Sequence, residues 1–288
     1  MKAKTIEKVL TTKIEDWIST IKDDEIANRA RNGAIVTGGC IASMLLKEPV
    51  NDFDVYFKDA KTAKAVASYY IKEFIKDTDP SVTIELCDDE ERARIKVSSI
   101  GVAGLEENDE SDEIESYAET ENTGSVEEAL SGKYRPVFVT ENAITLTNKV
   151  QLVFRFSGNA DEIHKNYDFV HCTNYWESGT GKLTLRQPAL EALIARELRY
   201  VGSKYPICSV MRLRKFIKRG WTINAGQILK MAIQIGELDL TDPSVLRDQL
   251  TGVDMAYFSE LIGLIKEKDL SGEKVNSTYI YEIVDRIF

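Results

Sequence analysis

The sequence lacks several features that would mark other classes of protein. It has no apolar run of about 18 residues, which excludes a membrane-spanning helix. Residues 1–17 carry charges throughout and have no apolar centre, so we expect no signal peptide. The four cysteines are widely spaced, form no CxxC pair and are accompanied by only two histidines, which argues against a zinc site. A reduced, cytoplasmic setting fits these absences best.

The chain nevertheless contains enough apolar material to fold. Its 288 residues are 43% hydrophobic, which supports a real core and excludes wholesale disorder. That length fits one large domain or two ordinary ones.

The charge is unevenly distributed. A formal net charge of −10 argues at first against a nucleic-acid partner. However, residues 106–128 hold eleven of the 47 acidic side chains and no Lys or Arg, so the remainder is nearly neutral. Such a block cannot bury enough surface to fold, and we interpret it as a flexible acidic insertion. Residues 182–219 have the opposite bias, with ten Lys or Arg against two Glu.

Hydrophobic periodicity predicts the order of the elements. Helical patterns cover residues 5–30 and 60–76, and the pattern is again helical from residue 187 onward. Strand patterns occur at 34–37, 51–57, 81–87, 94–100, 134–140, 143–148, 150–156 and 167–175. The sequence therefore predicts an α+β domain over 1–184, with a mostly antiparallel or mixed sheet, and a helical domain over 185–288. The expected boundary lies near 180–187, in the Gly-rich segment WESGTGK that starts at residue 176.

Residues 33–57 contain the pattern most typical of chemistry. Asp52 and Asp54 are two apart on a predicted strand, so both carboxylates share one face and suit Mg²⁺ or Mn²⁺. Gly38 and Gly39 stand where a strand turns into a helix, where a phosphate can approach backbone N–H groups. Taken singly, the aspartates also fit solvated surface and the glycines an ordinary turn. Their combination at this spacing favours a nucleotide site.

The segment GGCIASMLLKEPVNDFDVYF resembles the signature of the DNA polymerase β-like nucleotidyltransferase superfamily. It is most similar to the head of class II tRNA CCA-adding enzymes and bacterial poly(A) polymerases. DFVHCTNYWESGTGKLTL, ALEALIARELRYVG and SVMRLRKFIKRGWTI resemble later head and neck segments in the same order. The resemblance covers roughly residues 33–57 and 168–223. It implies a polymerase β-like head followed by a helical neck and body.

The resemblance also implies site residues. Two Mg²⁺ ions held by aspartates would clamp the attacking hydroxyl and the leaving pyrophosphate of an NTP. Asp52 and Asp54 match the family's aspartates, and Asp168 is the candidate third metal ligand and catalytic carboxylate, although an Asp that caps a strand end fits as well. Residue Gln151 and those after it on the neighbouring strand offer no carboxylate. The expected contacts to nucleotide or RNA are Gly38, Gly39, Ser43, Arg199, Lys204, Arg212 and Lys215.

Departures from the family pattern shape the expected function. The motif that reads the incoming base falls on Tyr205, Pro206 and Ser209, without the expected Glu, Asp or Arg. The resemblance therefore implies a metal-dependent nucleotidyltransferase that acts on an RNA 3′ end, but it does not support CCA addition itself. Two alternatives stay open: transfer to a protein or small molecule, and a decayed transferase that only binds nucleotide or nucleic acid. The divergent core with its acidic insertion resembles a bacteriophage member, which would work in the host cytoplasm.

Overall fold

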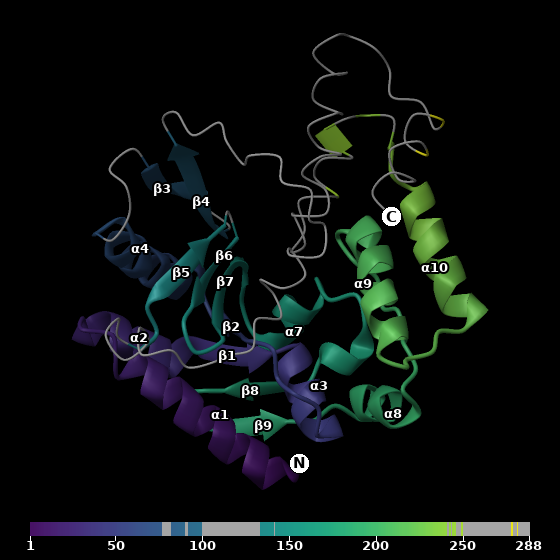
Figure 1. Ribbon diagram of the computed structural model, residues 1–288, viewed down its shortest axis with the longest axis horizontal. Helices are drawn as coiled ribbons and strands as arrows, with labels where there is room; N and C mark the ends of the chain where they lie inside the picture. Colours follow the sequence, from purple (N-terminus) through teal and green to yellow (C-terminus); the bar gives the residue numbers. More distant parts are fainter. Residues whose placement is uncertain are drawn as a thin grey trace. The chain divides into compact units, whose positions relative to one another are not determined.

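A computed structural model describes most of the chain. The described residues are 1–76, 82–89, 92–99, 133–140 and 142–240, with Asp242, Ser244, Val245, Gln249, Thr278 and Tyr281. The acidic insertion predicted at 106–128 lies outside them. The chain divides into two compact units, Met1–Lys165 with His171–Leu193, and Asn166–Val170 with Ile194–Phe288. Figure 1 shows the helices and strands of both units.

The first unit is built on a seven-stranded mixed sheet. The strand order is β5-β6-β7-β2-β1-β8-β9, and of these neighbours only β2 and β7 run parallel. The strands are β1 (Ala34–Thr37), β2 (Phe53–Phe57), β5 (Pro136–Val139), β6 (Ala143–Leu146), β7 (Val150–Ser157), β8 (Tyr175–Glu177) and β9 (Lys182–Thr184). The segment 176–182 thus forms the β8–β9 hairpin inside this unit.

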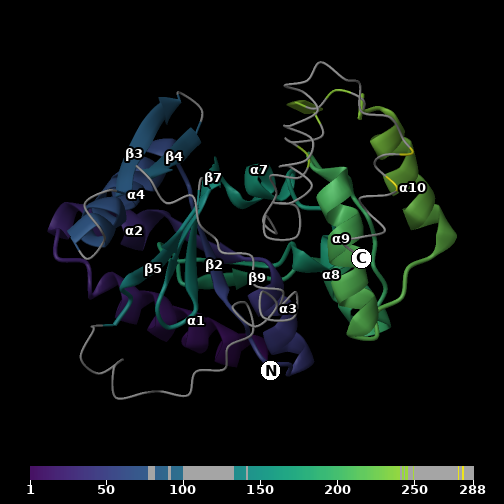
Figure 2. The same ribbon diagram turned by 45° about the horizontal axis from the view of Figure 1, so that its top comes forward.

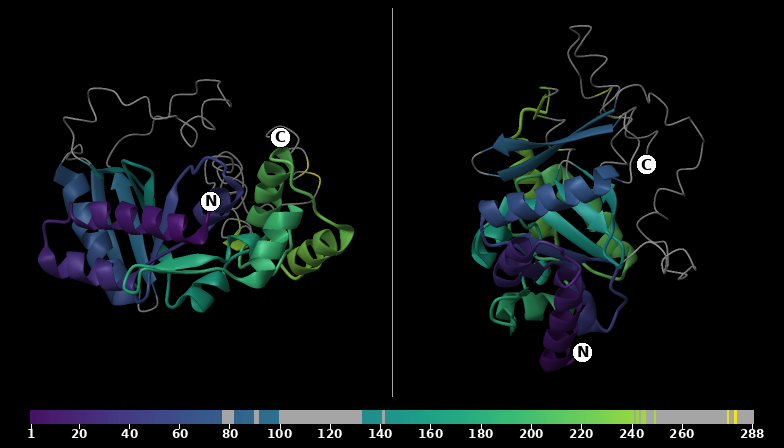
Figure 3. Two further views of the ribbon diagram at one scale, coloured as in Figure 1. Left: turned by 90° about the horizontal axis from the view of Figure 1, so that it is seen from below. Right: turned by 90° about the vertical axis from the view of Figure 1, so that its left-hand side faces the viewer.

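The two faces of the sheet differ in chemistry. Alternate residues of the central strands, among them Val36, Val55 and Leu152, are fully buried in one apolar cluster. Helices α1 (Ala3–Ile18), α2 (Asp24–Gly33), α3 (Gly39–Leu46) and α4 (Ala60–Lys76) contribute to the same cluster. Figures 1 and 3 show α1, α2 and α4 beside the strands. The alternation leaves Asp54 and Gln151 on the opposite face.

The N-terminal helical pattern forms two helices rather than one. α1 ends at Ile18 and α2 begins at Asp24. The side chain of Asp23 accepts hydrogen bonds from the backbone N–H groups of Glu25 and Ile26, so it caps a new helix. The apolar periodicity continues across this break, which is why the sequence indicated a single helix.

A separate two-stranded sheet accompanies the first unit. Strands β3 (Val82–Asp89) and β4 (Arg92–Ser99) pair antiparallel in continuous register and contact α4 (Figure 2). A short helix, α7 (Ala160–His164), follows β7 and is closed by a capping box between Asn159 and Glu162. Within the described part of the chain, none of the helices is both long and apolar enough to cross a membrane.

The second unit is helical, as the sequence predicts. Among its described residues the helices are α9 (Pro206–Lys218) and α10 (Ala225–Gly236), while α8 (Gln187–Ala195) lies mostly in the first unit. Phe169, Tyr200, Phe216 and Trp221 form a chain of edge-to-face aromatic contacts, with centroids 5.7–5.9 Å apart. The α+β class with a mixed sheet and following helices is therefore confirmed.

Candidate active site

The topology brings two sequence motifs to one edge of the sheet. β1 runs antiparallel to β2, so the end of β1 lies at the edge where β2 and its parallel neighbour β7 begin. Gly38 and Gly39 follow β1, and Asp52 and Asp54 stand at the start of β2. The glycine turn and the paired aspartates, separated by α3 along the chain, therefore meet within the first unit.

Asp54 lies in the middle of a polar row across the sheet. On one side its register partner in β7 is Gln151. On the other side the β1–β2 register pairs Val36 with Val55, and one residue further it sets Thr37 opposite Asp54. Asp54 is half-buried, whereas Asp52, just before the strand, is exposed. A carboxylate at each position can reach solvent and a ligand at this edge.

The glycine turn has the backbone geometry of an anion site. Gly38 has φ 97° and ψ −152°, a conformation essentially restricted to glycine. Its N–H donates to the carbonyl oxygen of Cys172 at 3.2 Å. No side chain caps the N-terminus of α3, and a Cβ added to Gly39 would meet no atom within 4 Å. The open space beside uncapped N–H groups suits a phosphate.

The thiol of Cys40, next to the glycine turn, lies close enough to the paired aspartates to be affected by their charges. This residue stands in the first turn of α3 and is buried. Burial, followed by the negative charges of Asp54 and Asp52, raises the pKa of the Cys40 thiol well above its usual range. The carboxylates therefore act electrostatically on the helix turn that would receive a phosphate.

The residues at this edge fit one divalent cation carried by a triphosphate. Mg²⁺ is usually held by one or two carboxylates together with substrate phosphates, and Asp52 and Asp54 supply two carboxylates. Over the described ranges, no three His, Cys, Asp or Glu gather in a way that could hold a metal. The neighbouring strand offers the amide of Gln151 beside Asp54. The donor set does not match a cage of three carboxylates.

The prediction that Asp168 lies on a central strand is wrong. Val170–Cys172 forms a 3₁₀ turn, and Phe169 makes only an isolated bridge to Tyr200. Asp168 Oδ2 accepts from Arg212 Nη1 at 2.5 Å, and its Oδ1 accepts from the Phe169 N–H at 3.0 Å. Phe169, one of the apolar neighbours that suggested a strand, instead packs against Tyr200 and Phe216 within the second unit.

The pairing of Asp168 with Arg212 changes the interpretation of both residues. Arg212 belongs to α9, and the sequence predicted it as a contact to nucleotide or RNA. Asp168 is 8% exposed, so its charge needs a partner inside the fold. Within the second unit the guanidinium supplies that partner. The carboxylate is thereby engaged in a structural ion pair.

The other predicted contacts lie on several elements of the two units. Arg199 forms an ion pair with Glu197 at 3.4 Å, and the ammonium of Lys204 lies 5.7 Å from the ring centroid of Tyr205. Lys215 is exposed on α9. Ser43 is half-buried in α3, where its carbonyl oxygen accepts from the backbone N–H of Glu48.

A buried polar group that the sequence did not reveal lies beside the glycine turn. Thr37 Oγ1 lies 2.8 Å from His164 Nε2 and donates to the carbonyl oxygen of Asn174 at 2.9 Å. Burial, and then the charge of Arg186, lower the pKa of His164 to about 4, so the imidazole is neutral near pH 7. Thr37 was recognisable as the one polar residue in the apolar run before the glycines. Its partners are set by tertiary structure.

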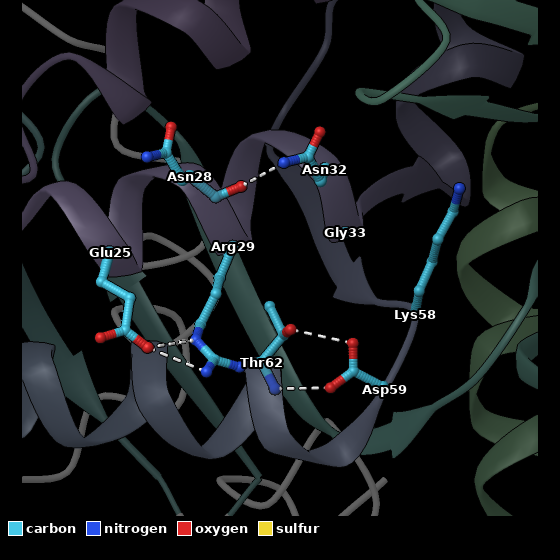
Figure 4. Close-up of a pocket in the computed structure, with 8 residues that line it drawn as sticks. All are labelled: Glu25, Asn28, Arg29, Asn32, Gly33, Lys58, Asp59 and Thr62. Carbon is cyan, nitrogen blue, oxygen red and sulfur yellow. Dashed lines mark hydrogen bonds and ion pairs between the residues drawn. The ribbon is translucent and has the colours of Figure 1, made fainter.

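A polar pocket lies at the other end of β2. Its volume is about 450 Å³, and Figure 4 shows its lining. The lining residues are Glu25, Asn28, Arg29, Asn32, Gly33, Lys58, Asp59 and Thr62. Arg29 pairs with Glu25 at 2.9 Å and Lys58 with Glu177 at 3.0 Å. Because these cations already face carboxylates, the pocket has little excess charge to attract an ionic ligand.

Comparison with known proteins gives a family and several similar structures. A family model described as Gabija anti-defense 2 family protein matches residues 8–196. Gabija anti-defense 2 of Bacillus phage SPbetaL7 is 22% identical over 259 residues, which cover 89% of this chain and 49% of that protein. The chain thus spans about half the length of this curated relative, a phage protein, in agreement with the expected phage membership.

Two similar solved structures are CCA-adding enzymes, the group whose motifs the sequence resembles. The Thermotoga maritima enzyme complexed with tRNA has 14% identity and a TM-score of 0.40, covering 82% of this chain and 49% of that chain. The Bacillus stearothermophilus enzyme in complex with CTP has 13% identity and a TM-score of 0.37, covering 77% and 45%. The family match extends over the whole sheet and its glycine and aspartate motifs, and the chain belongs to the Gabija anti-defense 2 family.

Proposed function

We propose that this protein is a metal-dependent nucleotidyltransferase, which transfers a nucleoside monophosphate from an NTP to an acceptor hydroxyl and releases pyrophosphate. The observation that carries the proposal is the meeting of Asp52 and Asp54 with the uncapped, glycine-lined start of α3. An anion-binding helix end beside two carboxylates is the arrangement that a Mg²⁺–triphosphate pair requires.

Each group would have a definite role. Backbone N–H groups of Gly39 and Cys40 would hold phosphate oxygens. Ser43, one turn further along α3, would contact the nucleotide. Asp52 and Asp54 would hold Mg²⁺ or Mn²⁺, which when bound neutralises charge developing on the phosphates. The neutral Thr37–His164 pair would keep the end of β1 in place beside Asp54. The chain's contribution is positioning and charge complementarity.

The proposed acceptor is an RNA 3′ end. Support comes from the basic stretch 182–219, whose exposed cations include Lys204, Lys215 and Lys218. Lys and Arg on an exposed helix suit a phosphate backbone, and such contacts weaken with salt. Arg199, which also pairs with Glu197, would be a further contact to RNA. Arg212 would not contact RNA itself but would stabilise α9 through its pair with Asp168.

A protein acceptor is the second candidate. The relative in Bacillus phage SPbetaL7 is named for action against Gabija. This chain has Tyr205, Pro206 and Ser209 where the motif of CCA-adding enzymes that reads the incoming base has Glu, Asp and Arg. We therefore propose an anti-defence role, in which modification of a defence component with a nucleoside monophosphate would be the activity. A nucleotide-binding protein without transfer is the remaining alternative.

The test incubates the full chain with each labelled NTP, Mg²⁺ or Mn²⁺, and either total RNA or lysate proteins from defence-bearing cells. We expect label to enter one acceptor class, with loss of at least about a thousandfold in the Asp52→Asn/Asp54→Asn variant. The Asp59→Asn variant is a matched control at the other end of β2, and it should retain transfer. Transfer that survives the double substitution would overturn the proposal.

A further inference from the structure

The place beside Asp54 in the neighbouring strand is occupied by an amide. In the parallel pair of β2 and β7, Phe53 is in register with Val150, Asp54 with Gln151 and Val55 with Leu152. In-register residues of adjacent strands point to the same face, with strands about 4.8 Å apart. Gln151 is half-buried while both of its neighbours in β7 are fully buried in the core. Its side chain therefore shares the face of Asp54.

The other flank of Asp54 offers no carboxylate either. Thr37 occupies it, and its hydroxyl is engaged with His164 Nε2 and the carbonyl oxygen of Asn174. Asp168, the acid that the sequence suggested, is engaged with Arg212. In the parts of the chain for which the structure gives positions, no triplet of potential metal ligands occurs.

An amide and a carboxylate differ in what they hold. The amide oxygen of Gln is a neutral ligand that cannot take up a proton near pH 7, whereas a carboxylate brings a full negative charge. A cation that travels with the triphosphate completes its shell with phosphate oxygens and needs few protein ligands. A second cation, away from the β- and γ-phosphates, depends on protein carboxylates and is bound weakly beside an amide.

We propose that the site takes a single divalent cation together with its nucleoside triphosphate, and that Gln151 is the residue that leaves a second cation position weak. The inference rests on the proposed function and specifies its cation stoichiometry. It makes Gln151 a specificity-determining residue of the same site, and it accounts for the mismatch between this donor set and a three-carboxylate cage.

The experiment titrates Mn²⁺ into the full chain in the presence of an NTP analogue with a non-cleavable α,β bond, and reads free Mn²⁺ by electron paramagnetic resonance. We expect one bound Mn²⁺ per wild-type chain. Gln151→Glu, which replaces the amide with a carboxylate of the same shape, should bind a second Mn²⁺ at least about tenfold more tightly than the wild type does. Gln151→Asp provides the same test if the first variant does not fold.

Two further variants separate the possible failures. Ser157→Glu adds the same charge six residues along β7, about 20 Å away, and should leave the stoichiometry at one. Two Mn²⁺ ions on the wild type, or unchanged binding in both Gln151 variants, would overturn this inference alone. Tight Mn²⁺–nucleotide binding by the Asp52→Asn/Asp54→Asn variant would instead overturn the proposed function.

Discussion

Removing Arg212 should destabilise the second unit, because it leaves the carboxylate of Asp168 buried without its partner. The side chain of Asp168 is 11% exposed and that of Arg212 is 27% exposed, and their N–O distance is 2.5 Å. The carboxylate also accepts the Phe169 N–H, so it cannot leave the fold without breaking a second hydrogen bond. The perturbation is Arg212→Ala, with Asp168→Ala and the double variant completing a cycle.

The burial of the two side chains sets the expected magnitude. Loss of one partner from a buried ion pair costs about 3–5 kcal/mol of unfolding free energy. Because Arg212 is partly exposed, we expect about 3 kcal/mol for Arg212→Ala. Asp168→Ala should cost less, about 1–2 kcal/mol, since the long Arg212 side chain can turn toward water. The double variant should fall short of the sum by about 2 kcal/mol.

Amide hydrogen exchange of the intact chain is the suitable assay, because a chain with two compact units need not unfold in one step. Protection of α9 amides should fall about a hundredfold in Arg212→Ala. The matched control is Arg29→Ala, whose partner Glu25 is 76% exposed in the same helix; it should change local stability by less than about 0.5 kcal/mol.

The refuting results are specific. Unchanged α9 protection in Arg212→Ala would contradict a structural ion pair. If Asp168→Ala also abolished Mn²⁺–nucleotide binding while its α9 protection matched the wild type, Asp168 would be the metal ligand that the sequence suggested.

Three other experiments test the site. Gly38→Ala should cost about 1–3 kcal/mol because of its positive φ, whereas Gly39→Ala should leave the melting temperature nearly unchanged yet weaken NTP binding; equal effects on melting would contradict this. The pKa of His164 is lowered to about 4 in the folded chain, so as the pH falls the unfolded state binds the proton before the folded state does. Stability should therefore drop by about 2–3 kcal/mol between pH 6.5 and 4 and hold above that range, and His164→Phe should remove this drop in acid-unfolding curves. The Cys40 thiol should resist iodoacetamide at pH 8 in the folded chain, and rapid alkylation there would show that it is accessible and ionised.

Local patterns were read correctly where backbone geometry alone decides. The alternation within β2 places Asp54 on the face opposite Phe53 and Val55, whereas Asp52, which the sequence predicted on the same face, lies just before the strand. The glycine pair marks a conformation that side chains disfavour, and Gly38 adopts it. The alternation over residues 150–156 and the helical pattern after residue 187 likewise yielded β7 and the helices that follow.

The sequence by itself determined most of the helices and strands and the face on which Asp54 stands, since these depend on spacings of two to four residues. Tertiary structure alone decided the partners. The register of β2 against β7 set Gln151 beside Asp54, and folding of the second unit set Arg212 against Asp168, 44 residues away. Apolar neighbours of Asp168 fit a strand or a packed turn equally well in sequence. Pairing between distant segments is chosen by the packing of the whole core, and no local pattern encodes it.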